Sequence, residues 1–377
     1  SLCMPALSLG SSLVSPAAET PSVAAQAINA RALEHAISKM LSHPLIEVNQ
    51  LGNEIKAVAQ KETPTLVKYA DESPFLIESY QVFTSLAQRM VLQPESNPDW
   101  CRLVAFDAQA EDRILASALF HFGYSGYAQA LAYIQALNSH DKRRLALNLL
   151  TKASKYEPPA RELEHSSFTF ELTLDQGAFF ELKRHRMMTQ TPQALTTLLG
   201  YAIPRAVVEA GFETPFRKAM DTANQAYAMI SRFNPVAASY VVPNAYNRRV
   251  LLTFNLRAAD HFCNLRAAPN AHFSIRRVAR RVAEQIKTST PLLGTLLRIP
   301  PGETWQEVLK SQALKGYVYD GVSSQPLTRN ISGHSISIPV TVRGQNIGAL
   351  KLEALETDRE WTDDELAMMK AAAERAA

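Results

Sequence analysis

One short stretch, residues 168–174, limits the possible folds most strongly, because its apolar and polar side chains alternate strictly. The apolar set is Phe168, Phe170, Leu172 and Leu174, and the polar set is Thr169, Glu171 and Thr173. A period of two predicts a β-strand with one buried face. The Asp175-Gln176-Gly177 sequence that follows is typical of a turn.

A helical run follows the expected turn and ends at Arg184-His185-Arg186, called here the Arg-His-Arg cluster. Two guanidiniums on either side of an imidazole can hold phosphate or another anion. The alternative is a solvated basic helix end, which also suits the negative end of the helix dipole. The residues alone favour this alternative, since solvated charge runs are common.

The order of several short motifs resembles the flavin-dependent thymidylate synthase family over residues 100–298. The motifs are Glu162-Leu163-Glu164-His165, then Ser166-Ser167-Phe168-Thr169-Phe170, the Arg-His-Arg cluster, Asn255-Leu256-Arg257, and Arg266 nine residues after Arg257. The resemblance implies an α/β (α+β) fold, in which helices cover a mostly antiparallel sheet. It also implies a homo-oligomer, a tetramer in this family, with sites between subunits.

The resemblance assigns an FAD site to six residues of this sequence: Glu164, Arg184, His185, Arg186, Asn255 and Arg257. Arginines can grip a pyrophosphate in a bidentate manner, and an asparagine amide can pair with the edge of a ring. The alternative for Asn255 is a helix N-cap between a strand and a helix. His165 is expected to be structural, and His261 to pack at an interface.

The nucleotide side of the site departs from the family pattern. The family has Ser, Asn, Glu, Ser and Arg where this sequence has Thr189, Thr191, Pro192, Ala194 and Thr196, and it has Arg and Gln at Ser239 and Glu181. Two upstream flavin ligands are also changed, to Pro159 and Arg161. The substrate-binding candidates are therefore Arg266 and Glu181, although the Glu181 carboxylate would repel a nucleoside phosphate. Losing several charge-assisted contacts at ~1.5–3 kcal/mol each would weaken nucleotide binding by orders of magnitude.

Two functions follow from the resemblance. The first is reductive methylation of dUMP to dTMP with FAD, with methylenetetrahydrofolate and NADPH as cosubstrates, in a form whose activity is altered or lost. The second is a non-catalytic flavin- or nucleotide-binding module coupled to a sensor domain.

An internal repeat relates the start of the chain to residues 239–298. The segment 29–35 matches 255–261 at an offset of 226 residues, and each segment is followed by an amphipathic helix and a Thr-Pro stop, at Thr63 and Thr290. The expected apolar stripes are Leu51, Ile55, Val58 and Ala59 in the first copy, and Ile275, Val278, Ala279, Val282, Ala283 and Ile286 in the second. The first copy is predicted to be the C-terminal part of a second synthase-like unit that docks on the second copy's helix.

The first copy also repeats part of the predicted cofactor site. Asn29 and Arg31 correspond to Asn255 and Arg257, so we expect them to help complete a flavin site. The alternative for Asn29 is a helix cap alone. Met40 stands where the second copy has Arg266, which favours a scaffold role on the nucleotide side.

Four parts are predicted along the chain: a partial synthase-like repeat at 1–72, a linker helix at 73–98, a complete synthase-like domain at 99–298, and a partial domain at 299–377. The last part resembles the C-terminal half of a GAF-type sensor domain. Its alternating segment around 336–342, its return strand at 347–353 and a capped helix at 363–376 carry that resemblance. A strand is also expected at 239–243, and helices at 110–122, 127–137, 141–155 and 211–233.

Composition excludes several classes. The net charge of +3 does not point to a nucleic-acid partner, and the four arginines at 276, 277, 280 and 281 are expected on a solvated or phosphate-facing helix side. Three distant cysteines without CxxC spacing argue against a metal site or a disulfide framework and fit the cytoplasm. The sequence contains no apolar run of membrane-spanning length and no signal segment. Because it begins at Ser1 and ends within an expected helix, we expect a fragment of a longer protein.

Overall fold

The computed structural model describes residues 29–89, 99–150, 157–315, 335–342 and 345–353. Contacts between residues group the chain into two units. The first comprises 1–91, 99–197 and 201–317, and the second comprises 92–98, 198–200 and 318–377. Helix and antiparallel sheet are mixed, as the sequence predicts.

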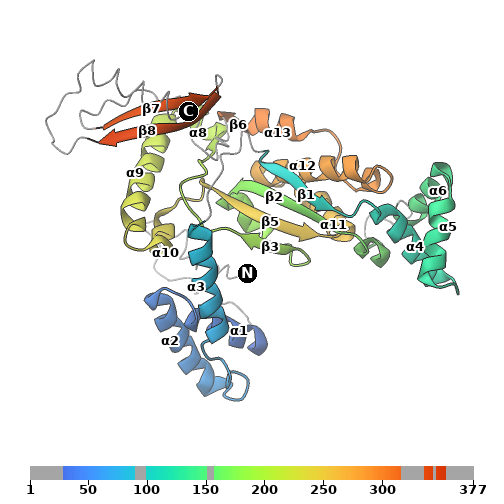
Figure 1. The fold of residues 1–377 in the computed structure, drawn as a ribbon, viewed down its shortest axis with the longest axis horizontal. Coiled ribbons are helices and arrows are strands. Elements are labelled where there is room, and N and C mark those ends of the chain that lie inside the picture. The colour runs from blue at the N-terminus through green and yellow to red at the C-terminus, as the bar shows by residue number, and fades with distance from the viewer. Residues whose placement is uncertain (1–28, 90–98, 151–156, 316–334, 343–344, 354–377) are drawn as a thin grey trace. The chain divides into compact units, whose positions relative to one another are not determined.

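A four-stranded antiparallel sheet forms the centre of the first unit (Figure 1). Its strands, in spatial order, are β1 (Cys101–Phe106), β2 (Phe168–Asp175), β5 (Asn247–Phe254) and β3 (Thr189–Pro192). The alternating residues of β2 are confirmed as a half-buried strand, because Phe168, Phe170, Leu172 and Leu174 are all 0% exposed.

The turn expected at Asp175-Gln176-Gly177 is wrong. Asp175 is the last residue of β2, and its side chain accepts a hydrogen bond from the N–H of Ala178, 2.9 Å away. The carboxylate thereby caps helix α7 (Gln176–Leu182), so the strand passes directly into the helix. The turn instead follows α7 and carries the Arg-His-Arg cluster.

Helix α12 (Phe273–Ser289) lies along the sheet and contacts β1, β2 and α7 (Figure 1). Its apolar stripe is confirmed, since the six predicted residues are each 0% exposed. Gln285 joins the helix to β1: it accepts from the N–H of Leu103 at 2.8 Å and donates to the carbonyl oxygen of Cys101. Helix α11 (Leu256–Arg266) precedes α12 and packs against it.

Three of the four arginines expected on a solvated or phosphate-facing side of α12 are buried, which corrects the prediction for them, while the side chain of Arg281 is 24% exposed. Arg276, Arg277 and Arg280 are 8%, 0% and 6% exposed. The guanidinium of Arg277 stacks on Trp100, 3.9 Å from the ring centre. Arg276 and Arg280 pair with Glu303 at 3.2 and 3.3 Å, and this carboxylate replaces the water that a buried guanidinium would lose.

Three helices and a short 3-10 turn lie between β1 and β2. They are α4 (Ala110–Phe122), α5 (Tyr127–Ala136), α6 (Ser139–Leu150) and η1 (Arg161–Glu164), and α4 contacts the other three. The expected helices at 110–122 and 127–137 are confirmed, and α6 begins two residues before the expected 141–155, whose residues 151–155 lie outside the described residues. Glu111 anchors α4 by accepting from the N–H groups of Leu292 and Leu293 at 2.7 and 2.6 Å.

The region between β3 and β5 is mainly helical. It holds β4 (Ile203–Pro204), α8 (Arg205–Glu209), α9 (Glu213–Ser231), α10 (Pro235–Ala238) and η2 (Ser239–Val241). The strand expected at 239–243 is wrong, because Asn234 caps the N–H groups of Val236 and Ala237 and starts a helical segment that continues into η2. Helix α9 confirms the helical stretch expected at 211–233, and Gly211, at φ 77°, separates it from the preceding α8.

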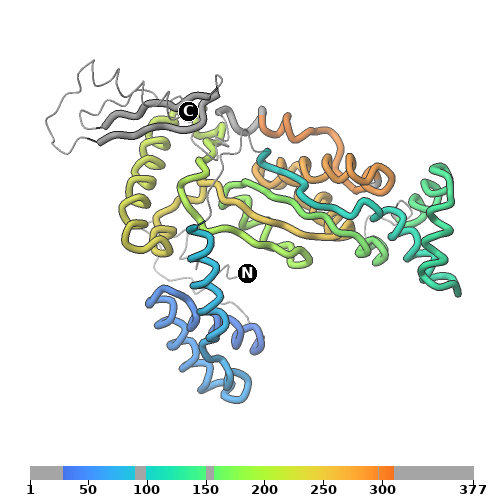
Figure 2. The backbone as a smooth tube through the Cα atoms, viewed as in Figure 1, coloured from blue at the N-terminus to red at the C-terminus, as the bar shows by residue number. Residues whose placement is uncertain are grey.

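Helices α1 (Ala30–Leu41), α2 (Ile46–Glu62) and α3 (Pro74–Gln88) form the beginning of the described chain (Figures 1 and 2). The predicted repeat has matching helix ends: Asn29 and Asn255 cap α1 and α11, and Thr63 and Thr290 end α2 and α12. The stripe of α2 is incomplete, because Val58 is 63% exposed. That helices α1 and α2, called here the α1–α2 hairpin, belong to a second synthase-like unit stays a prediction.

The α1–α2 hairpin packs against a helix that the sequence did not predict as its partner. Met40, Leu45 and Val48 pack against Val236 and Ala237 of α10, whereas the sequence favoured the equivalent helix α12. Asn49 donates to the carbonyl oxygens at the end of α1, of Met40, Leu41 and His43, at 2.8, 2.9 and 3.0 Å. In the second copy, the carbonyl oxygens of Ala267 and Pro269, which match those of Leu41 and His43, instead accept from Arg280 and Arg276.

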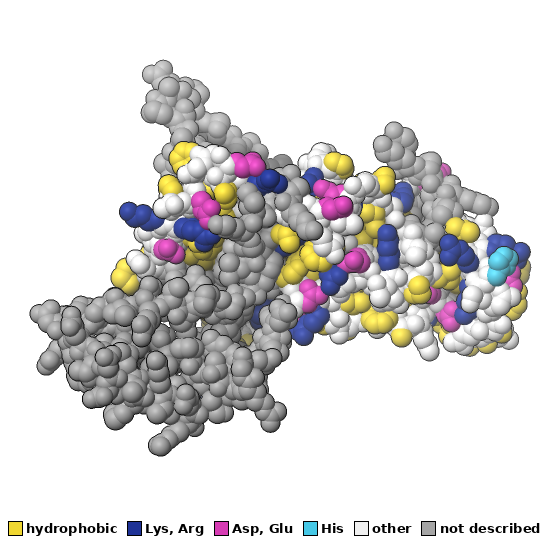
Figure 3. Space-filling model, turned by 90° about the horizontal axis from the view of Figure 1, so that it is seen from above, with side chains coloured by type: hydrophobic (Ala, Val, Ile, Leu, Met, Phe, Trp, Pro, Cys, Tyr) yellow, Lys and Arg dark blue, Asp and Glu magenta, His cyan; other side chains and the backbone are white. Residues whose placement is uncertain are grey.

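After α12 come η3 (Gly294–Leu296), α13 (Trp305–Gln312) and β6 (Ala313–Lys315), which pairs with β4. In the second unit, β7 (Ser335–Val342) and β8 (Gln345–Glu353) form the predicted antiparallel hairpin, while the expected helix 363–376 lies outside the described residues. None of the described helices is long and apolar enough to cross a membrane. On the face in Figure 3, acidic and basic side chains are interspersed over the described surface.

Candidate functional site

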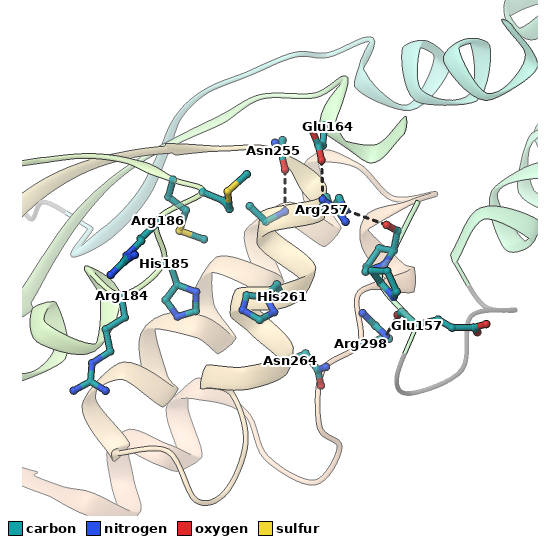
Figure 4. A pocket seen from close by; sticks show the side chains of 15 residues that line it. Glu157, Glu164, Arg184, His185, Arg186, Asn255, Arg257, His261, Asn264 and Arg298 are labelled. Atoms are coloured by element: carbon teal, nitrogen blue, oxygen red, sulfur yellow. Dashed lines mark hydrogen bonds and ion pairs between the residues drawn. The ribbon is translucent and has the colours of Figure 1, made fainter. Parts of the chain in front are cut away.

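A cavity of about 550 Å³ opens at one end of the sheet (Figure 4). Four segments line it: the chain before and within η1, the turn after α7, helix α11, and one residue that follows η3. The lining residues are Glu157, Pro158, Pro159, Glu164, Arg184, His185, Arg186, Met187, Met188, Asn255, Arg257, Ala258, His261, Asn264 and Arg298. All six residues that the resemblance assigns to FAD are among them.

The antiparallel register explains why distant segments meet at this cavity. Phe168, the first residue of β2, pairs with Phe254, the last residue of β5, and Thr189, the first residue of β3, pairs with Thr253. The start of β2, the start of β3 and the end of β5 therefore lie at the same end of the sheet. The segments joined to these ends carry Glu164, the Arg-His-Arg cluster and Asn255.

Helix α11 presents a polar face to the cavity. Arg257, His261 and Asn264 are spaced by four and three residues, so they share one side of the helix, as Figure 4 shows. At the start of the helix, the side-chain oxygen of Asn255 accepts from the N–H of Ala258 at 2.8 Å. Asn255 is thus an N-cap, and no hydrogen bond of its amide nitrogen is recorded among the described residues. The role of Asn255 as a helix cap is therefore compatible with its predicted role as a cofactor ligand, since the cap uses only the side-chain oxygen.

Glu164 and Arg257 form an ion pair in the wall of the cavity. Arg257 donates to Glu164 at 2.8 Å and to the carbonyl oxygen of Pro159 at 3.0 Å, while Arg161 pairs with Glu164 at 3.2 Å. Arg161 first and then Arg257 hold the pKa of Glu164 below its usual value. Pro159 and Arg161, the two upstream positions at which flavin ligands of the family are changed, thus belong to the network that fixes this wall.

The two arginines of the cluster are the most available cations of the site. The side chain of Arg184 is 68% exposed, and its nearest recorded carboxylate, Glu181, is 3.4 Å away. Among the described residues no ion pair of Arg186 is recorded. Neither guanidinium is committed to a short ion pair, so both can receive an anion.

His185 contributes no charge at neutral pH. It is 7% exposed, and its Nε2 accepts a hydrogen bond from Nε of Arg266 at 3.0 Å, so the proton is on Nδ1. Burial, followed by the charges of Arg266 and His261, lowers the pKa of His185 to about 4. The ring packs edge-on against Phe262, with ring centres 5.0 Å apart.

Arg266, the predicted nucleotide ligand, does not line the cavity. Besides its bond to His185, its Nη1 donates to Oε2 of Glu181 at 2.5 Å, and its Nη2 is 3.5 Å from the carbonyl oxygen of Glu181. The structure therefore brings the two substrate-binding candidates together as an ion pair. Their roles toward a nucleotide stay predictions.

Asn29 and Arg31 are absent from the cavity lining. Asn29 caps α1 by accepting from the N–H of Ala32 at 2.9 Å. A shared site across an oligomer contact stays a prediction, with the cap as the role that the structure supports.

The sequence interpretation missed several lining residues. The i, i+4, i+7 spacing from Arg257 could have found His261, expected only to pack, and Asn264. Arg298 carries no local signal. It donates from Nη2 and Nε to Oδ2 of the buried Asp260 at 2.6 and 3.0 Å. Within the described ranges, no cluster of His, Cys, Asp and Glu could hold a metal ion.

Comparison with known proteins finds two family models that match this chain. A family model described as "Thymidylate synthase complementing protein" matches residues 102–292, and a GAF domain model matches 247–377. The GAF match thus overlaps β5, α11 and α12 and extends beyond the predicted boundary at 299.

The relatives fall into two groups. A "UPF0159 protein" of Chlamydia muridarum is 32% identical over 72% of this chain and 53% of its own length, and one of Thermoplasma acidophilum is 26% identical over 75% and 58%. A "Flavin-dependent thymidylate synthase" of Geobacter sulfurreducens is 32% identical over 35% of this chain and 61% of that protein. The chain spans about half the length of the UPF0159 relatives.

Proposed function

Because the chain belongs to the thymidylate synthase complementing protein family, we propose that it is a flavoprotein whose cavity binds FAD. The observation that carries the proposal is that all six residues assigned to FAD by sequence line one cavity at one end of the sheet. They come from three segments separated by many residues, so their convergence is independent of the motif that suggested each one.

The chemistry of the cavity fits a flavin nucleotide. Its lining holds four arginines and two glutamates, and with His185 neutral it favours an anionic ligand. The volume lies within the range of ligand pockets, about 300–1,000 Å³. Arg184 and Arg186 would hold the pyrophosphate, Asn255 would donate its amide N–H groups, and Met187, Met188 and Pro158 offer an apolar wall to a ring. FAD, when bound, supplies hydride-transfer chemistry.

We further propose that conversion of dUMP to dTMP, with methylenetetrahydrofolate and NADPH, is weak or lost. The family pattern places arginines where this chain has Thr196 and Ser239, and neither side chain supplies a cation for a nucleotide. Arg266 is held by Glu181. These features favour a flavin-binding module coupled to the GAF domain as the second candidate function. Tritium release from labelled dUMP distinguishes the two, and turnover comparable to that of ordinary synthases would refute the loss.

The FAD site is tested by removing its two available cations. The Arg184→Ala/Arg186→Ala double variant should weaken FAD binding by roughly a hundredfold or more, since two charge-assisted contacts are lost. The measurement is an FAD titration followed by flavin fluorescence and by the absorbance bands of the bound flavin. Arg144→Ala is a matched control, because Arg144 is 71% exposed and 3.7 Å from an i−3 carboxylate, much like Arg184. Equal FAD affinity in the double variant and the parent would refute the site.

A further inference from the structure

The carboxylate of Glu181 lies between two guanidiniums beside the cavity. Its Oε2 is 2.5 Å from Nη1 of Arg266, and its Oε1 is 3.4 Å from Nη2 of Arg184. The side chains of Arg266 and Glu181 are 15% and 28% exposed, so this pair is screened less than a surface ion pair.

Every nitrogen of the Arg266 guanidinium already faces an acceptor. Nε donates to His185, Nη1 donates to the carboxylate of Glu181, and Nη2 is near the backbone oxygen of Glu181. A phosphate that took the Nη1 donor would have to displace the carboxylate, gaining one charge-assisted bond while another was lost, and at the remaining N–H donors it would meet the negative charge of Glu181. Moreover, His185 accepts at Nε2, so this nitrogen offers no proton to an anion.

We propose that Glu181 is a built-in counter-anion that closes Arg266 to phosphate-bearing ligands. It is thus the residue that sets specificity on the nucleotide side, and the inference rests on the proposed function in placing that side next to the flavin cavity. With the carboxylate in place, the site beside the flavin favours ligands without a phosphate. With the carboxylate neutralised, Arg266 becomes an anion site.

The deciding variant is Glu181→Gln, because glutamine keeps the length and an acceptor oxygen but removes the charge. The probes are inorganic phosphate and dUMP, each titrated by isothermal calorimetry. Regaining one charge-assisted contact should raise the affinity for both by roughly ten- to hundredfold. Adding Arg266→Gln to this variant should remove the gain, since Arg266 is the proposed ligand.

Glu171→Gln is the matched control. Glu171 also lies between two guanidiniums, 2.9 Å from Arg102 and 3.1 Å from Arg249, and is 27% exposed. Neither of the guanidiniums that it contacts is that of Arg266, so its neutralisation should leave both affinities unchanged. An equal gain in this control would refute the proposal, because the gain would then reflect net charge rather than the release of Arg266.

FAD affinity is measured on the same variants, so failure of this inference is distinct from failure of the proposed function. Unchanged phosphate and dUMP affinity in a folded Glu181→Gln protein overturns the role of Glu181, whatever its FAD affinity. Loss of FAD binding by the Arg184/Arg186 variant concerns only the flavin site. Should Glu181→Gln not fold, Glu181→Ala provides the same comparison with the same outcomes.

Discussion

The neutral state of His185 should make the protein less stable in mild acid. Its pKa in the folded protein is about 4, against 6.5 for an unperturbed histidine. As the pH falls below about 6.5, the unfolded chain binds a proton at this position before the folded protein does. The contribution of His185 to stability is therefore fully present above pH 6.5 and is lost progressively as the pH falls toward 4.

The size of the effect follows from the pKa difference. The whole difference corresponds to about 3 kcal/mol in the free energy of unfolding. Since His185 borders a cavity that admits water, we expect solvent screening to reduce the loss to about 1–2 kcal/mol. Protonation would also remove the acceptor for the Nε–H of Arg266, which lies 3.0 Å from Nε2.

The assay is urea unfolding of the flavin-free protein at several pH values between 7.5 and 4.5, compared with His185→Gln. Glutamine can still accept from Arg266 but does not titrate, so the parent should lose about 1–2 kcal/mol more than the variant over this range. His140→Gln, at a side chain 85% exposed, is the control and should behave like the parent. Parallel pH profiles of the parent and His185→Gln would refute the reasoning.

Other predictions concern pairs and caps. Arg298→Ala leaves the carboxylate of Asp260, 1% exposed, without its guanidinium and should lower the free energy of unfolding by about 3 kcal/mol; Arg102→Ala, in an exposed pair, should cost less than about 1 kcal/mol in the same urea titration, and equal costs would contradict this account. Asn29→Ala and Asn255→Ala should each lose a helix cap and about 1 kcal/mol, whereas only Asn255→Ala should lower FAD affinity. A comparable loss of FAD affinity in Asn29→Ala would instead support a site shared with the first copy.

Periodicity predicts the parts of this fold in which one face of an element is buried. Both β2 and α12 have one face toward the core and one face away from it, and the apolar residues predicted on their inner faces are 0% exposed. Periodicity fails where a polar side chain sets the local geometry. Asp175 turns an expected loop into a capped helix, and Asn234 does the same before the expected strand at 239–243.

The site shows the same limit. The order of the motifs predicted the six residues that line the cavity, because these motifs lie in segments that meet at the same end of the sheet. It could not reveal that Arg266 is held by Glu181, or that Arg277 is buried against Trp100. Such partners are distant in sequence, and a charged residue has no local pattern that indicates whether water or another side chain satisfies it.

The register of β2, β5 and β3 places the residues that stabilise the fold apart from the residues that would contact a ligand. Backbone pairing and the buried face of the sheet place the three segments, whereas the side chains that would meet a ligand extend from turns and a helix beyond the strand ends. Under the proposed function, residues such as Ala194 and Thr196, which lie in the segment after β3, would change ligand recognition at little cost to folding. In a fold of this kind, substitutions at the strand ends can change or abolish ligand binding while the sheet keeps its structure.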